Sequence, residues 1–491
     1  MAGPPSSSRA DDLTEGALLR PMLRVAWPLV VIQLLQVMYN VADTFWLGRL
    51  SADAVGALSL AFPLVFLFIS VGGGFTAAGA ILVAQHTGAS NARAGEDGET
   101  DPGFSVAPDR AAGRVAGTTL GFVMLVSLVI GALGYLSVEP MLALLPANAA
   151  TATDVVPLAA AYMQVFFLAT PFLFGFFVFV ALMRGYGDTR GPLRVMAISV
   201  ALNVVLDPVL IFGWGPIDAY GIQGAAWATL LSRAVATVIG WYVLFGTSAG
   251  PDVRPPDLVP DLGIVRDVVK LGTPSALEQS GTAFAFVVLT AMVATFPPAV
   301  VAAYGLGNRL ISLVFLPAMG LSQAVNTVVG QNLGAERADR AWRAVRAALS
   351  VVVVVMLPVT LFASLFPEVI VTVFLPPDAP DAGTTIEFAA TYLRTAALMF
   401  AFTGVFEVGR GAFRGAGRTT TALVFSLIAL WGVRVPATYY LVFEGGWGTT
   451  GIWWAVVFGD VVGAVIVVAW LLRGTWTTAV VDTGGGAPTD D

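Results

Sequence analysis

The residues best suited to chemistry are two polar side chains inside a long apolar run, Asn203 and Asp207. Their four-residue spacing places both on one face of a helix, a single turn apart. An ionisable group at membrane depth is costly and indicates a functional site when it faces a cavity or a partner. Pro208 follows directly and cannot donate a backbone hydrogen bond, so the carbonyl of Val204 loses its helical partner. A carboxylate, an amide oxygen and this carbonyl on one turn predict a seat for a small cation.

The amino-acid composition indicates that these residues belong to a membrane protein. The chain has 491 residues, of which 57% are hydrophobic and only 12% are charged, as expected for a polytopic membrane protein. It has no cysteine, which excludes disulfides and thiolate metal sites, and its single histidine, His86, excludes a multi-histidine metal cluster. A formal charge of -7 argues against binding to nucleic acid.

Twelve apolar segments are long enough to cross a bilayer. They lie at about 22–48, 55–86, 112–137, 155–184, 190–213, 221–247, 263–295, 299–330, 341–365, 385–414, 418–443 and 450–473. Arginine and lysine gather after every second segment, while the alternate loops carry mainly acids, so we expect both termini in the cytoplasm and the protein in the plasma membrane.

The two halves of the chain repeat. Pro28 and Gln33 match Pro274 and Gln279 at an offset of 246 residues, because 274 − 28 = 246. Farther along, the Arg-Gly-x-Gly-x-Thr pattern that starts at Arg184 returns 230 residues later. Six segments per half place both halves in the same sense, which is a parallel repeat typical of alternating-access carriers. We therefore expect an all-α integral membrane protein of twelve transmembrane helices in two pseudo-symmetric six-helix bundles.

The same reading divides the chain into five parts. They are a disordered cytoplasmic tail (1–21), a first lobe (22–247), a cytoplasmic linker (248–262), a second lobe (263–473) and a disordered tail (474–491).

Several motifs together resemble the multidrug and toxic compound extrusion (MATE) family, most closely its prokaryotic DinF-like branch. They are Trp27-Pro28, the run from Tyr39 to Gly48, the junction from Arg184 to Thr189, Asn203 with Asp207-Pro208, and Gly224-Ala-Ala-Trp-Ala-Thr229. The resemblance covers essentially all twelve segments. It implies a V-shaped pair of six-helix bundles that export organic, often cationic, compounds in exchange for sodium or protons.

The resemblance also implies a coupling site. Asp43, Asn203 and Asp207 match the residues that carry the coupling ion in such relatives, and Tyr162 and Thr229 match groups that complete the site in some of them. In a sodium-coupled protein the first three would hold Na⁺. Counting residues from the ends of their segments independently places Asp43, Asp207, Tyr162 and Thr229 at one depth, roughly 8–12 Å below the outer surface.

The two acids of this site have no counterpart in the second half, so we expect the cation site in the first lobe only. Two carboxylates that face one cavity should recruit a cation or a proton, and the alternative is a hydrogen-bonded structural pair. Binding would draw the first helix toward the fifth, with Pro28 and Pro208 as bending points.

Other polar residues in the segments allow two interpretations. For Glu278, Glu407 and Asp460 we expect ion pairs with arginines of the second lobe. A substrate or second proton site is the alternative for Glu278 and Glu407, with Gln33 and Gln36 as further candidates. Arg233 has no partner that the sequence identifies.

We therefore expect a monomeric antiporter for small organic compounds that needs no cofactor. A lipid-linked oligosaccharide flippase of the same wider superfamily is an alternative, but it would need a basic cavity. A membrane-embedded enzyme is the alternative from another class, and it would need a convergent nucleophile, base or metal set. The sequence does not choose between Na⁺ and H⁺.

Overall fold

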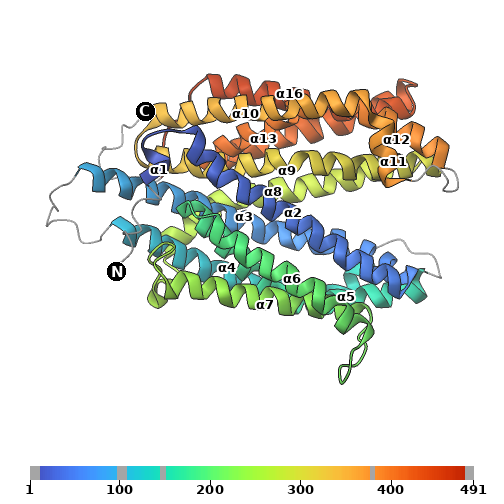
Figure 1. The fold of residues 1–491 in the computed structure, drawn as a ribbon, viewed down its shortest axis with the longest axis horizontal. Helices are drawn as coiled ribbons and strands as arrows, with labels where there is room; N and C mark the ends of the chain where they lie inside the picture. Colours follow the sequence, from blue (N-terminus) through green and yellow to red (C-terminus); the bar gives the residue numbers. More distant parts are fainter. Residues whose placement is uncertain (1–10, 97–107, 144–150, 376–381, 481–491) are drawn as a thin grey trace. The chain divides into compact units, whose positions relative to one another are not determined.

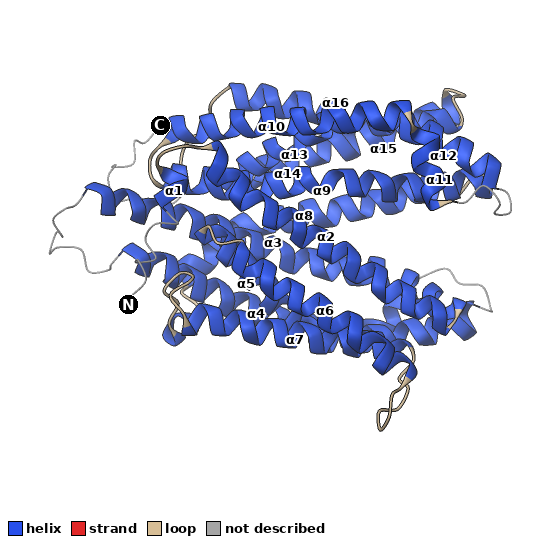
Figure 2. Cartoon of the chain, viewed as in Figure 1, coloured by secondary structure: helices blue, strands red, loops and turns tan. Residues whose placement is uncertain are grey.

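A computed structural model describes residues 11–96, 108–143, 151–375 and 382–480. Within these ranges the chain is almost entirely helical, and its only bridge of β type joins Trp214 to Ile217 (Figure 2). The predicted all-helical class is therefore confirmed.

The helices follow one another along the chain with short connections (Figure 1). In the first half they are α1 (Asp11–Thr14), α2 (Leu19–Leu50), α3 (Ala52–Glu96), α4 (Pro108–Ala143), η2 (Thr151–Val155), α5 (Val156–Tyr186), α6 (Arg190–Phe212), α7 (Ile222–Gly246) and η3 (Pro255–Leu258). In the second half they are α8 (Leu262–Val293), α9 (Pro298–Gly334), α10 (Ala338–Leu365), α11 (Pro367–Phe374), α12 (Ala382–Ala397), α13 (Phe400–Gly415), α14 (Thr419–Leu427), η4 (Ile428–Arg434), α15 (Val435–Tyr439), η5 (Tyr440–Glu444) and α16 (Thr449–Leu472).

Eleven spans in the described part of the chain are long and apolar enough to cross a membrane. A twelfth consists of α12 and α13, which are bent by 54° at the break between them. The sequence predicted one segment there, at about 385–414. At the break, the Leu398 and Met399 amides bond to carbonyls three residues back instead of four, which tightens the turn.

The chain divides into two compact units. The first unit is built around Val31–Gln279, and the second comprises Gly16–Val30 and Ser280–Val480. Two helices contribute to both, because α2 changes unit at Val31 and α8 changes unit at Ser280.

The centre of the first unit is α5. It is apolar on all sides, as a helix surrounded by other helices must be, and large phenylalanines such as Phe167, Phe174 and Phe179 are almost completely buried along it. Helices α3, α4 and α7 pack against it, and α6 packs against α7. This packing fixes α6 and α7, which carry most of the predicted cation site.

The chain turns at Gly187 in the junction between α5 and α6. Gly187 takes a left-handed conformation with φ 106°, and its amide bonds to the carbonyls of Met183 and Arg184. Asp188 then accepts hydrogen bonds from the amides of Arg190 and Gly191, at 2.9 and 3.2 Å, and so caps α6. The repeat in the second half has Gly417 in the same region, with φ 73°.

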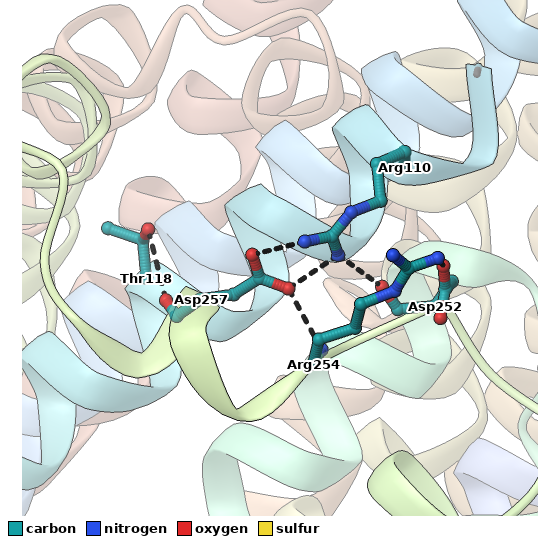
Figure 3. Close-up of polar contacts among 5 residues, drawn as sticks. All are labelled: Arg110, Thr118, Asp252, Arg254 and Asp257. Atoms are coloured by element: carbon teal, nitrogen blue, oxygen red, sulfur yellow. Dashed lines mark hydrogen bonds and ion pairs between the residues drawn. The ribbon is translucent and has the colours of Figure 1, made fainter. Parts of the chain in front are cut away.

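The linker after α7 lies against α4 within the first unit (Figure 3). Gly113, Gly117 and Gly121 follow one another at four-residue intervals on α4. A Cβ atom at any of these three positions would collide with linker residues Asp252, Asp257 or Leu258. The three glycines therefore form a groove in which the linker backbone touches the helix.

Ion pairs hold the linker in this groove. The guanidinium of Arg110 donates two hydrogen bonds to the Asp257 carboxylate, at 2.6 and 2.7 Å, as Figure 3 shows. Asp257 also accepts a bond from the Arg254 amide at 2.8 Å. Burial raises the pKa of Asp257, but the bonds from Arg110 and the Arg254 amide outweigh it, so the pKa lies below its ordinary value.

Both chain ends contain structure in segments expected to be disordered tails. In 1–21, the helix α2 already begins at Leu19, and Leu13 is buried in α1. In 474–491, Trp476 is buried, its indole Nε1–H donates to the Leu471 carbonyl at 3.1 Å, and its ring meets Trp342. An apolar ring that finds a packing partner gains enough burial to order these short stretches. Residues 1–10 and 481–491 lie outside the described ranges.

Candidate functional site: a buried carboxylate pair in the first unit

Asn203 and Asp207 lie on one face of α6, as their spacing predicts. Both are fully buried, and the Asn203 amide donates a hydrogen bond to Asp207 Oδ1 at 3.1 Å. The helix continues through Pro208 to Phe212, so the proline removes one backbone bond without ending the helix. The amide and the carboxylate thus form one hydrogen-bonded polar pair on this face of the helix.

Asp43 joins this pair from α2. Its side chain is only 6% exposed, and its carboxyl is an electrostatic neighbour of Asp207 and Asn203. Two carboxyl groups this close repel one another when both are ionised, so the arrangement favours a proton or a cation between them. The structure therefore brings together the three residues predicted to hold the coupling ion.

Three buried oxygen atoms of this group have no hydrogen-bond partner among the described residues. They are Oδ1 of Asp43, Oδ1 of Asn203 and Oδ2 of Asp207. A buried polar atom without a partner carries a free-energy cost of about 1–3 kcal/mol, more when it is charged. Such oxygen atoms suit a small cation that takes oxygen ligands, and they could supply part of its coordination.

The other two predicted residues lie around this group. Tyr162 of α5 is buried and interacts electrostatically with Asp43 and Asp207. Thr229 of α7 is also buried, but its Oγ1 accepts a hydrogen bond from the Tyr39 hydroxyl at 2.8 Å. Tyr39 therefore connects α2 to α7 one turn before Asp43.

Arg233 lies one turn beyond Thr229 on α7 and is only 1% exposed. Its guanidinium stands 4.6 Å from the centre of the Tyr39 ring and 5.0 Å from that of Phe176. One amino group donates to Gln36 Oε1 at 3.0 Å, and the other contacts the Met196 sulfur at 3.4 Å. Gln36, predicted as a substrate or proton residue, thus binds this arginine.

The remaining candidates are Glu407, Glu278 and Gln33. Glu407 forms an ion pair with Arg410, which also donates to Ser426 at 2.8 Å. Glu278 is buried within α8, and Gln33 is half-buried on α2. A substrate or second proton site at Glu278, Glu407, Gln33 and Gln36 therefore stays a prediction.

Asp460, the half-buried acid of α16, has a hydroxyl and an arginine beside it. Thr403 donates to Asp460 Oδ2 at 2.9 Å, and Asp460 interacts electrostatically with Arg434. The guanidinium of Arg434 stands 5.1 Å from the centre of the Phe286 ring. Arg394, another arginine of the second half, pairs with Glu368 at 2.9 Å.

Reasoning from the sequence missed two features of the first-unit site. One is the hydrogen bond from Tyr39 to Thr229, and the other is the set of residues that surround Arg233. For Tyr39 a signal existed, because it precedes Asp43 by four residues and so shares its helix face. In the described part of the chain, no group of three or more His, Cys, Asp or Glu side chains is placed to hold a metal ion.

Up to twelve spans in the described part of the chain, with buried acids among them, define a polytopic membrane protein. The MatE family model matches residues 28–96, 108–209 and 274–440, which is well over half of the chain. The chain therefore belongs to the MatE family, the multidrug and toxic compound extrusion transporters, and is a transporter and not an enzyme.

Curated relatives span nearly the whole chain. A probable multidrug resistance protein, YpnP of Bacillus subtilis, is 28% identical over 90% of this chain and 92% of its own length. A probable multidrug resistance protein NorM of Thermotoga maritima is 25% identical over 93% of both chains. A protein named FAD transporter, from Shewanella oneidensis, is 27% identical over 86% of this chain and 88% of its own.

Solved structures share the fold. A multidrug resistance MATE family transporter of the MOP superfamily, in an outward-facing conformation, superposes with a TM-score of 0.81 at 23% identity, covering 95% of this chain and 98% of that one. A MATE in complex with MaL6 gives a TM-score of 0.83 at 23% identity, with coverages of 95% and 99%. The predicted fold of twelve membrane helices in two lobes is confirmed.

Proposed function

We propose that this protein exports small organic, often cationic, compounds in exchange for Na⁺ or H⁺ that flows inward, by alternating access of two lobes. Family membership and the names of the relatives, multidrug resistance proteins and an FAD transporter, support organic compounds as the substrates. The observation that carries the coupling step is the set of three partnerless buried oxygens on Asp43, Asn203 and Asp207.

Na⁺ and H⁺ would each reduce the negative charge of the two carboxylates and give partners to the partnerless oxygens. Na⁺ would take the three oxygens as ligands, and a proton would instead be shared between the Asp43 and Asp207 carboxyl groups. In both cases the site loses one negative charge in a region from which water is largely excluded.

The bound cation would tie α2 to α6, because Asp43 is on one helix and the other two ligands are on the other. Pro28 lies inside α2 and removes one backbone hydrogen bond there, which makes this helix easier to bend. Pro208 does the same one residue after Asp207. Binding would therefore change the course of α2 and reshape the substrate compartment beside it.

The alternation of basic and acidic loops supports a place in the plasma membrane with both termini in the cytoplasm. The protein would act as a monomer, because each chain contains both lobes of the carrier. Glu278 is a candidate for a second proton or substrate site, and an E278Q variant with unchanged transport would contradict that role.

Transport in proteoliposomes tests the coupling site. Purified protein is given ethidium as the organic cation, with a sodium gradient and a proton gradient imposed separately. We expect wild-type exchange under one of the gradients, and D43N and D207N should lose at least about tenfold of it, since each removes a charge that the cation needs.

D218N is the matched control, because Asp218 is an exposed acid in the loop between α6 and α7. It should transport as the wild type does. Full exchange by D43N or D207N, in protein that remains monodisperse in detergent, would contradict the proposal.

A further inference from the structure

The guanidinium of Arg233 is a full positive charge inside the membrane-spanning part of the first unit. It is buried and makes no ion pair with an acid among the described residues, and its Nε has no hydrogen-bond partner there. Its direct neighbours are neutral: the Gln36 amide, the Met196 sulfur and the faces of Tyr39 and Phe176. Aromatic faces and one amide oxygen lower the cost of this charge but do not neutralise it.

The Tyr39 ring that faces Arg233 lies one turn before Asp43 on α2, so Asp43 is the acid closest to this arginine along that helix, and its charge acts on Arg233. Asp43 in turn interacts with Asp207, so the three charges form one group that spans α2, α6 and α7. Tyr39 and Tyr162, the titratable side chains that face this group, are ordinarily neutral near pH 7. With both carboxylates ionised the group carries two negative charges and one positive charge, a net charge of minus one.

We propose that Arg233 is the built-in counter-charge of the cation site, and that it limits the site to one monovalent cation in each cycle. The inference rests on the proposed function, because it assumes that Asp43 and Asp207 hold the coupling ion. In a medium of low dielectric a group of charges is most stable near neutrality, and one Na⁺ or one proton completes the balance here. Without the arginine the two carboxylates would call for two cations.

The position of Arg233 suits this role and not that of a ligand. Its guanidinium donates to Gln36 and stands over the Tyr39 ring, and among the described residues it forms no ion pair with Asp43 or Asp207. It therefore acts at a distance and leaves the partnerless oxygens of Asp43, Asn203 and Asp207 available to the cation.

Counting bound cations tests the inference. Equilibrium dialysis of the purified full-length protein against radioactive sodium, and proton uptake in sodium-free solution, give the number of monovalent cations per molecule. We expect one for the wild type. R233M keeps the length and apolar contacts of the side chain but removes its charge, so it should take two cations, or bind the first about tenfold or more tightly.

Two further variants separate charge from structure. R233K keeps the charge and should again take one cation. D43N leaves one negative and one positive charge and should take none, whereas D43N/R233M restores a net charge of minus one and should take one cation again. A purely structural role of Arg233 would make the double variant bind less than D43N, or equally little.

The outcomes distinguish the inference from the function on which it rests. Cation binding that is unchanged in D43N and in D207N contradicts the proposed function, and the inference fails with it. Cation binding that depends on both acids, together with two cations in the wild type or an R233M variant unchanged in number and affinity, contradicts the counter-charge alone. The wild-type count decides the matter even where R233M does not fold.

Discussion

Asn203 and Asp207 show what a single residue pair can predict. A spacing of four within an apolar run already places both side chains on one helix face, and the hydrogen bond between them follows from helix geometry alone. For Asp43, 160 residues before Asn203 (203 − 43 = 160), counting residues gives the same depth in the membrane, but only the resemblance to a family indicates that its helix lies beside that of Asn203. The surroundings of Arg233 are harder still to predict from the sequence, because its partners lie on α2, α5 and α6 and share no sequence pattern with it.

Asp257 gives a prediction at the residue scale. Its pKa is lower in the folded protein than in the unfolded chain, so its contribution to stability is complete above the unfolded pKa of about 3.9 and is lost as the pH falls through the folded value. D257N should therefore lower the free energy of unfolding by about 1–3 kcal/mol at neutral pH, and this difference should shrink below about pH 4.

Tryptophan fluorescence during unfolding in detergent, at neutral and acidic pH, measures the effect. R110M serves as the partner variant, and D257N should have little further effect in its background because the ion pair is already absent. If D257N lowered the free energy of unfolding as much at acidic pH as at neutral pH, this account would be contradicted.

At the scale of elements, boundaries were easier to predict than contacts. Proline and aspartate between 248 and 262 predicted a linker, but not that it lies in a glycine groove on α4, because Gly113, Gly117 and Gly121 also fit packing against another helix. The break between α12 and α13 was missed for a related reason. The residues around it, Leu398 and Met399, are ordinary helix formers, so tertiary packing and not local preference must set the bend.

The groove makes its own prediction. In G117A the new methyl group meets the Cβ atom and backbone of Asp257, so the linker must shift, at a cost of about 1–3 kcal/mol in the free energy of unfolding. G305A is the matched control, because no atom lies within 4 Å of a Cβ atom at that helical position. It should be neutral or stabilising by up to about 1 kcal/mol, since alanine favours the helix. Equal thermal stabilities of the two variants would exclude close packing of the linker on α4.

At the scale of the whole molecule, the repeat and the run of apolar segments predicted the fold class correctly. Each half independently signals six spans, so an error at one boundary does not change the count. The structure divides α2 and α8 between the two units, which the sequence could not predict. Hydropathy identifies a membrane span but not the helices that pack against it.

The absence of cysteine makes the proposed orientation directly testable. A single cysteine introduced at Val259, 74% exposed in the linker, should react with a membrane-impermeant maleimide only after cells are permeabilised. One at Asp218, in the exposed loop after α6, should react in intact cells, since acidic loops face outward. The cysteine-free parent chain is the control, and the opposite labelling pattern would reverse the orientation.

The change of unit within α2 and α8 has a consequence for biogenesis. Residues 1–247 lack the stretch 262–279 that α8 adds to the first unit, and residues 248–491 lack Gly16–Val30, which α2 adds to the second. Neither half of the polypeptide holds all the parts of one unit, despite their internal repeat. The first unit therefore cannot finish folding until α8 has been synthesised. Two fragments separated between the halves should each fold only when they are expressed together.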